Sequence, residues 1–230
     1  MTEGKAKFGR VNRRDFLKLS GSGITGLTIG FTLNLRSKTV NAASPIQANS
    51  WIKIENNNQV TLVCDRAEMG QDVYTSLTML IAEELEVDIR KIKVEFAPPG
   101  EAYINSFLGA QLTGGSTSVR DAWGKLRTAG ASARTMLIGA AATDWAVKPS
   151  ECVAKNGFVL GPNSRKISYG ELAAKAATME IPKEVALKTS KDWKLIGKNN
   201  VKRLDTPSKV RGTAQFGIDT RVPGMLYAAV

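Results

Sequence analysis

Apolar and polar residues alternate in two short stretches near residue 50, and this period of two predicts a β-hairpin. The stretches are residues 51–54 and 59–65, and the Asn-rich residues 55–58 between them are typical of a turn. Residues 92–96 predict a further strand, which the sequence Pro98-Pro99-Gly100 ends. We therefore expect a small sheet in this part of the chain.

A spacing of three to four residues between apolar positions predicts two helices. The longer one begins near Ser118 and ends before Pro149, and its many small residues favour close packing. In the shorter one we expect Glu83, Glu84 and Glu86 to face away from the apolar side or to flank it. The apolar stripes are Val73, Leu77, Leu80, Ile81 and Leu85 in the shorter helix and Val119, Ala122, Trp123, Leu126, Gly130, Ala133, Leu137, Ala140 and Ala141 in the longer one.

The second half of the chain predicts another hairpin around Asn156-Gly157, and Ser168 and Glu171 have the spacing of a capping box. Together these elements predict an α+β fold with mixed sheet layers packed against helices. We interpret residues 43–190 as one domain and the Lys-rich residues 191–207 as a connector. Residues 208–230 then start a second domain with two predicted strands.

The last predicted strand, residues 225–230, has no later segment with which to pair. An unpaired apolar strand is a hydrophobic edge that natural proteins avoid. We therefore expect the chain to be the N-terminal portion of a longer polypeptide. The alternative is that this strand pairs within the chain.

The net charge of +11 is unevenly distributed along the sequence. Residues 1–42 hold eight basic and two acidic residues, so most of the excess lies in this leader and a nucleic-acid partner is not expected. Arg13-Arg14 precede 17 uncharged residues, and Val40-Asn41-Ala42 has the small residues of a cleavage site. The leader resembles a twin-arginine signal and predicts a periplasmic or exported protein. An uncleaved anchor helix is the alternative.

The chain contains no histidine, which excludes His-based catalysis and His metal ligands. Its two cysteines, Cys64 and Cys152, either form a disulfide or remain separate thiols. Two thiols are too few for a [2Fe–2S] cluster, which normally takes four. We therefore assign neither catalytic nor metal-ligating residues to the sequence.

The stretch EMGQDVYT, residues 68–75, places Gly70 and Gln71 where a strand passes into a helix. Glycine allows a sharp turn or the close approach of a ligand, and an amide both donates and accepts hydrogen bonds. The helix start behind the pair has free N–H groups. The simpler interpretation is a helix-entry turn capped by Asp72 or Thr75.

The stretch LTGGSTSVRDAW, residues 112–123, combines two glycines with several hydroxyl groups before the long helix. Gly114 and Gly115 permit close backbone approach, and Ser116, Thr117 and Ser118 provide hydroxyl and N–H groups. Such a helix start suits a phosphate or pyrophosphate. The stretch is neither a Walker A loop nor a Rossmann fingerprint. Its simpler interpretation is an ordinary N-cap at Ser116 or Ser118.

Four stretches in this order and spacing, residues 66–88, 112–137, 169–177 and 203–230, resemble the large molybdopterin-binding subunit of xanthine-oxidase-family enzymes. The similarity is greatest to exported isoquinoline 1-oxidoreductase beta subunits and related aldehyde dehydrogenases. The resemblance implies that residues 208–230 begin a hammerhead-like α/β domain. It also implies a molybdenum cofactor, usually molybdopterin cytosine dinucleotide.

The resemblance implies that Gly70 and Gln71 contact the pterin side of the cofactor. It also implies that residues 115–118 hold the pyrophosphate or nucleotide end of the cofactor. Relatives often have Gly after the Gln, whereas Asp72 stands here, and a carboxylate beside an anionic cofactor is unfavourable unless it points away or caps the helix.

The implied reaction is hydroxylation of an aldehyde or N-heterocycle by water-derived oxygen. Its glutamate base is not found in this chain, and its electrons leave through a small [2Fe–2S] subunit or another electron-transfer partner. The alternative function is a non-enzymatic exported binding module or an inactive truncated remnant.

Overall fold

The structure, a computed structural model, describes residues 26–30 and 50–228. Its larger sheet has the strand order β1-β2-β3-β4, formed by β1 (Gly26–Gly30), β2 (Ser50–Glu55), β3 (Val60–Cys64) and β4 (Ile92–Phe96). The first three strands are antiparallel, and β4 runs parallel to β3. The predicted hairpin and the predicted third strand are thus confirmed.

The helix α2 (Val73–Leu85) forms the crossover between the parallel strands β3 and β4. All five residues of its predicted apolar stripe are buried. The short 3₁₀ helix η1 (Ile89–Lys91) leads into β4, and η2 (Glu101–Tyr103) follows it. The segment between β4 and the next long helix contains the helical turn η2 and an isolated bridge between Asn105 and Ala110.

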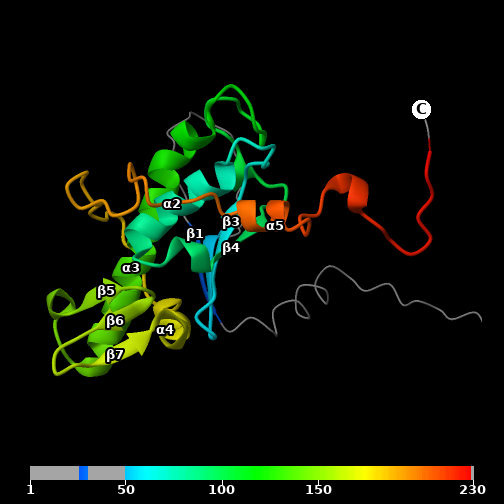
Figure 1. The fold of residues 1–230 in the computed structure, drawn as a ribbon. Helices are drawn as coiled ribbons and strands as arrows, with labels where there is room; N and C mark the ends of the chain where they lie inside the picture. The colour runs from blue at the N-terminus through cyan, green and yellow to red at the C-terminus, as the bar shows by residue number, and fades with distance from the viewer. Residues whose placement is uncertain (1–25, 31–49, 229–230) are drawn as a thin grey trace, which may run out of the picture.

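The long helix α3 (Ser118–Trp145) connects the two halves of the molecule, as Figure 1 shows. Beyond it lie η3 (Pro149–Glu151), the three-stranded antiparallel sheet β5 (Val153–Lys155), β6 (Phe158–Leu160) and β7 (Lys166–Ser168), and the helix α4 (Tyr169–Ala176). Ser168 and Glu171 form the predicted capping box of α4. These elements confirm the α+β fold class.

Close contact between α2 and α3 depends on Gly130, as the small residues of the α3 stripe predict. A Cβ atom at this position would lie 3.0 Å from both the Cβ of Glu84 and the carbonyl oxygen of Ile81. Of the predicted α3 stripe, Val119 and Trp123 are partly exposed and the others are buried. The two exposed members lie in the first two turns of α3.

The expectation that Glu83 and Glu84 face away from the core is wrong, because both side chains are fully buried. Glu84 accepts hydrogen bonds from Arg127 of α3. Glu83 accepts hydrogen bonds from the backbone N–H groups of Lys194, Leu195 and Ile196. Although burial opposes ionisation, these donors hold the pKa of Glu83 below its usual value. The predicted connector is therefore packed onto α2.

The C-terminal segment contains α5 (Thr206–Val210) and the 3₁₀ helix η4 (Gly217–Asp219), and residues 211–228 form no strand. The two strands predicted here are thus absent from the described residues. Figure 1 shows this segment leading away from the rest of the fold, and Ile218 and Leu226 are exposed. A strand needs a neighbour to pair its backbone groups, so an isolated segment does not form one.

Five residues of the predicted leader form β1, which pairs with β2. The rest of the leader, with Arg13-Arg14 and Ala42, lies outside the described residues, so its cleavage stays a prediction. Cleavage of the leader after Ala42 would remove β1 from the larger sheet. In the part of the chain that the structure describes, no helix is long and apolar enough to span a bilayer.

Substitution Gly130→Ala is expected to destabilise the fold by about 1–3 kcal/mol, because the new methyl group overpacks the α2–α3 contact. The matched control is Gly124→Ala on the same helix, where a Cβ meets nothing within 4 Å. That change is expected to stabilise by roughly 0.5–1 kcal/mol through helix propensity. Urea unfolding measures both free energies. Equal changes in the free energy of unfolding for the two substitutions would contradict the close approach of α2 and α3 at Gly130.

Candidate functional site

A buried group of charged side chains joins the end of β3 to the start of α3. The Arg66 guanidinium, which is fully buried, lies 2.6 Å from a carboxylate oxygen of Asp65 and 2.6 Å from one of Asp121. Lys125 also pairs with Asp121, and Ser106 donates backbone and hydroxyl hydrogen bonds to it. Strand and helix are therefore connected by an ionic bridge from which water is excluded.

The two ends of the Arg66 bridge differ in their proton affinity. Burial raises the pKa of Asp65 to about 6, although the neighbouring Arg66 opposes this shift. Burial acts in the same direction on Asp121, but hydrogen bonds from Lys125 and Ser106 outweigh it and lower the pKa of Asp121. Asp121 is therefore the more firmly ionised partner of Arg66.

One hydrogen bond beside this bridge joins the two glycine-containing regions of the sequence, and two more fix the shape of the second region. The backbone N–H of Ala67 donates to the Thr113 hydroxyl at 2.9 Å. The Asn105 amide donates to the Thr117 hydroxyl at 2.6 Å, and that hydroxyl donates to the Gly114 carbonyl at 2.8 Å. The turn at residues 68–72 and the loop at residues 112–118 are thus neighbours in one site.

The N-terminus of α2 is closed by Glu68. Its carboxylate accepts hydrogen bonds from the backbone N–H groups of Gly70, Asp72 and Tyr74, at 2.8, 3.0 and 3.2 Å. Although burial opposes it, these three donors lower the pKa of Glu68. Asp72, one of the two predicted cap residues, is the N-cap of α2, but its side chain makes no capping hydrogen bond, and Glu68 accepts from these N–H groups instead. The N–H groups expected to be free here are already occupied by an anionic group.

Gln71 uses its amide within its own turn. The amide nitrogen donates to the Ala67 carbonyl at 2.9 Å, and the amide oxygen accepts from the Met69 N–H at 2.6 Å. Gly70 has a φ angle of 103°, and a Cβ there would meet nothing within 4 Å. The turn therefore fixes its own shape and leaves open space at Gly70.

The N-terminus of α3, in contrast, has no side-chain cap. Its N-cap is Thr117, not Ser116 or Ser118 as predicted, and the Thr117 side chain makes no capping hydrogen bond. Gly115 and Ser116 have φ angles of 60° and 53°, and Ser116 is exposed. The first N–H groups of a helix lack intrahelical partners and carry partial positive charge. This helix start can therefore receive an anion.

These donors fit a cofactor that carries phosphate groups. Residues 115, 116 and 118 carry backbone N–H groups, and the Ser116 hydroxyl is exposed, whereas the Thr117 N–H already donates to the Gly114 carbonyl at 3.3 Å. The described residues suit the phosphates of such a cofactor, and they offer no cluster of side chains that could bind a metal directly. Among the described residues, no three His, Cys, Asp or Glu side chains cluster as a metal site, and Cys64 and Cys152 are buried free thiols.

A family model described as "Molybdopterin cofactor-binding domain" matches residues 2–219 of the chain. The chain therefore belongs to this family of molybdopterin-binding domains. The resemblance to molybdopterin-binding subunits of the xanthine oxidase family that the motifs predict is thereby confirmed.

The chain is similar to proteins that are much longer than itself. It is 32% identical to a membrane-bound aldehyde dehydrogenase [pyrroloquinoline-quinone] of Gluconacetobacter polyoxogenes, over 98% of this chain and 30% of the relative. It is 30% identical to the isoquinoline 1-oxidoreductase subunit beta of Brevundimonas diminuta, over 96% of this chain and 33% of the relative. The chain thus spans about a third of these proteins.

Among solved structures, quinoline 2-oxidoreductase from Pseudomonas putida 86 matches 55% of this chain and 16% of its own, with 18% identity and a TM-score of 0.42.

Several residues that build the site were not predicted from the sequence. Glu68, Arg66 and Asp121 lie beside or within the two stretches, and an acidic residue shortly before a helix is a visible capping signal. Arg203 gives no such signal. It lies 133 residues after Gly70 in the sequence, yet donates a hydrogen bond to the Gly70 carbonyl at 2.9 Å.

Substitution Asp121→Asn is expected to destabilise the fold by about 3–5 kcal/mol, because it removes one partner of the buried Arg66. The matched control is Asp144→Asn on the same helix, where the carboxylate is 40% exposed and pairs with Lys175. Exposed pairs contribute less than about 1 kcal/mol. Urea unfolding measures the free energy of unfolding of both variants. A loss at Asp121 no larger than that at Asp144 would exclude the bridge as the link between the loops.

Proposed function

We propose that this chain is the N-terminal, cofactor-binding part of an exported molybdenum hydroxylase large subunit. The observation that carries the proposal is the uncapped start of α3 beside the Gly70–Gln71 turn, in a chain of the molybdopterin cofactor-binding domain family. In this proposal residues 115–118 bind the pyrophosphate of molybdopterin cytosine dinucleotide, with Gly114 in the approach to them. Gly70 and Gln71 lie at the pterin side.

When bound, the cofactor supplies the oxidising centre for hydroxylation of an aldehyde or N-heterocycle with water-derived oxygen. The residues described here bind and orient it. The N–H groups of α3 hold negative charge, and the Arg66 bridge fixes the distance between the two loops. The catalytic base and the substrate pocket are assigned to the rest of the longer subunit.

Two further parts of the proposal concern the setting of the protein. The names of the similar proteins include a subunit beta, which supports a partner subunit here as well. We assign electron transfer to a small [2Fe–2S] subunit or an equivalent partner. The twin-arginine pattern of the leader supports export by the corresponding machinery to the periplasm.

Cofactor content of the full-length protein, made in a host that synthesises molybdopterin cytosine dinucleotide, tests the proposal. The purified protein is expected to contain molybdenum, pterin and cytidine nucleotide in equal amounts. Pyrroloquinoline quinone in their place, or a stable protein without any cofactor, would overturn it. The second outcome would favour the non-enzymatic binding module.

Substitution Ser116→Asp is expected to weaken cofactor retention at least about tenfold, because it places a carboxylate beside phosphate groups. The matched control is Ser116→Asn, which is neutral and nearly the same size. Asp and Asn both tolerate the positive φ of this exposed position, so neither change should disturb the fold. Pterin and molybdenum content give the readout. Equal retention in the two variants would remove this loop from the binding site.

A further inference from the structure

Arg203 faces three carboxylates at the turn that contains Gly70 and Gln71. Its guanidinium makes two hydrogen bonds to Asp205, at 2.8 and 2.9 Å. It also lies 3.6 Å from Glu68 and 3.5 Å from Asp72. Among the described residues it is the cation that forms ion pairs with Glu68 and Asp72.

Glu68 and Asp72 differ in the groups that stabilise their negative charges. Glu68 is stabilised by three backbone N–H groups of the α2 start. Asp72 makes no capping hydrogen bond, and its Oδ1 atom is buried without a hydrogen-bond partner. Its ion pair is the 3.5 Å contact with the Arg203 Nε atom. Arg203 is therefore the cation that offsets the negative charge of Asp72, although it shares its positive charge with Asp205 and Glu68.

The backbone conformation of Asp72 is one that a residue without a side chain also adopts. Its φ angle of 66° is left-handed, a conformation that glycine adopts without steric cost. The carboxylate thus adds negative charge at a position where a residue without a side chain would fit. A carboxylate close to an anionic ligand repels it, because the effective dielectric constant at a protein surface is well below that of water.

We propose that Arg203 is a positioning residue that neutralises Asp72 and so allows the Gly70–Gln71 turn to lie beside an anionic cofactor. The inference rests on the proposed function and adds a residue from outside both glycine-containing stretches. It explains how the site accommodates a carboxylate directly after Gln71.

A purely structural role for Arg203 is the competing explanation. The guanidinium donates a hydrogen bond to the Gly70 carbonyl, and the adjacent Leu204 N–H donates to the Thr75 hydroxyl at 2.9 Å. Both contacts tie residues 203–204 to the start of α2. They do not depend on the charge of Asp72, so a double-mutant cycle on Asp72 and Arg203 separates the two roles.

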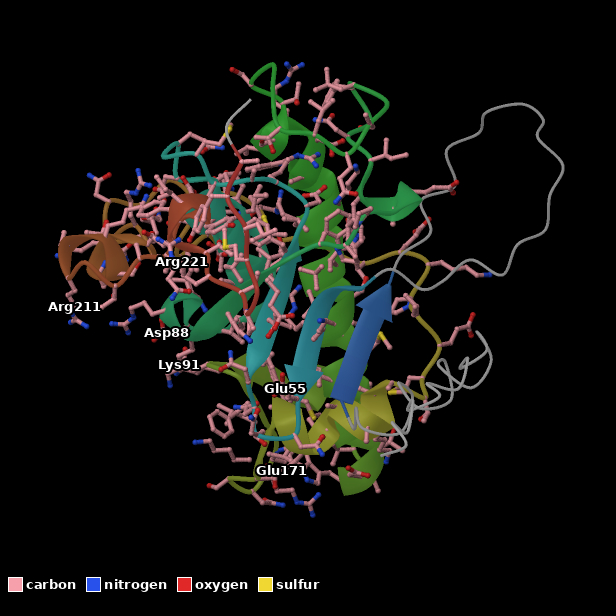
Figure 2. All side chains as sticks on the ribbon, turned by 90° about the vertical axis from the view of Figure 1, so that its right-hand side faces the viewer. Glu55, Asp88, Lys91, Glu171, Arg211 and Arg221 are labelled. Carbon is pink, nitrogen blue, oxygen red and sulfur yellow. The ribbon has the colours of Figure 1, made fainter. Side chains whose placement is uncertain are left out.

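The cycle compares wild type, Asp72→Gly, Arg203→Gln and the double variant in the full-length protein. Arg203→Gln is expected to raise the dissociation rate of the cofactor about tenfold when residue 72 is Asp and less than about twofold when it is Gly. The matched control is Arg211→Gln, an exposed arginine that points outward in Figure 2 and should leave the rate unchanged. An equal increase in both backgrounds would overturn the neutralising role.

The same cycle is repeated on cofactor-free protein with cytidine diphosphate as the anionic probe, and affinity is measured by calorimetry. Arg203→Gln should weaken this binding only in the Asp72 background. Absence of pterin from the wild type would refute the proposed function, whereas the cycle with cytidine diphosphate would still decide the role of Arg203. Failure of the wild type to bind either ligand would overturn both.

Discussion

The buried ionic bridge of Arg66 with Asp65 and Asp121 is the interaction on which the candidate site depends. It connects the residues that directly follow β3 to the first turn of α3, and Arg66 and Asp121 lie 55 residues apart in sequence. Buried pairs gain little stability over apolar contacts, but losing one partner leaves a costly uncompensated charge. The bridge therefore acts mainly by specifying a geometry. It allows one arrangement of the two strand-to-helix connections and keeps the loops beside each other.

The two helix starts in the site then take different roles. At α2, Glu68 already occupies the N–H groups, so this turn is stable without a ligand. At α3, the Thr117 side chain is turned toward Asn105 and Gly114, and the helix start keeps no internal cap. Asp121 in the first turn of α3 is paired with Arg66 and Lys125, so the partial positive charge of this helix start remains available to an anion. The structure therefore favours α3 as the end that holds phosphate and α2 as the end that presents a preformed turn.

The sequence predicts the fold well where local pattern decides the outcome. The hairpins, the strand at residues 92–96, the helices α2, α3 and α4 and the α+β class follow from periodicity and capping signals. It also indicates the two stretches of the site, because glycines and hydroxyl residues before a helix are local features. The five residues of β1 were not predicted, because a Gly- and Thr-containing stretch gains strand structure only from pairing with β2.

The errors concern contacts between distant residues. Glu83 and Glu84 look like solvent-facing residues of an amphipathic helix, yet they are buried by partners such as Arg127 and the backbone of residues 194–196. No periodicity reveals such partners, and the same holds for Arg203. The strands predicted after residue 212 fail for a related reason, since a strand depends on a neighbour that the described residues do not supply.

Amide hydrogen exchange of the full-length protein with and without bound cofactor tests the central claim most directly. Cofactor binding is predicted to slow exchange at residues 116–120, where the start of α3 would receive the phosphates. Gly70, Asp72 and Tyr74 should change little, because Glu68 accepts hydrogen bonds from their N–H groups in both states. Unchanged exchange at residues 116–120 with new protection confined to residues 70–74 would contradict the account and would place the phosphates at α2.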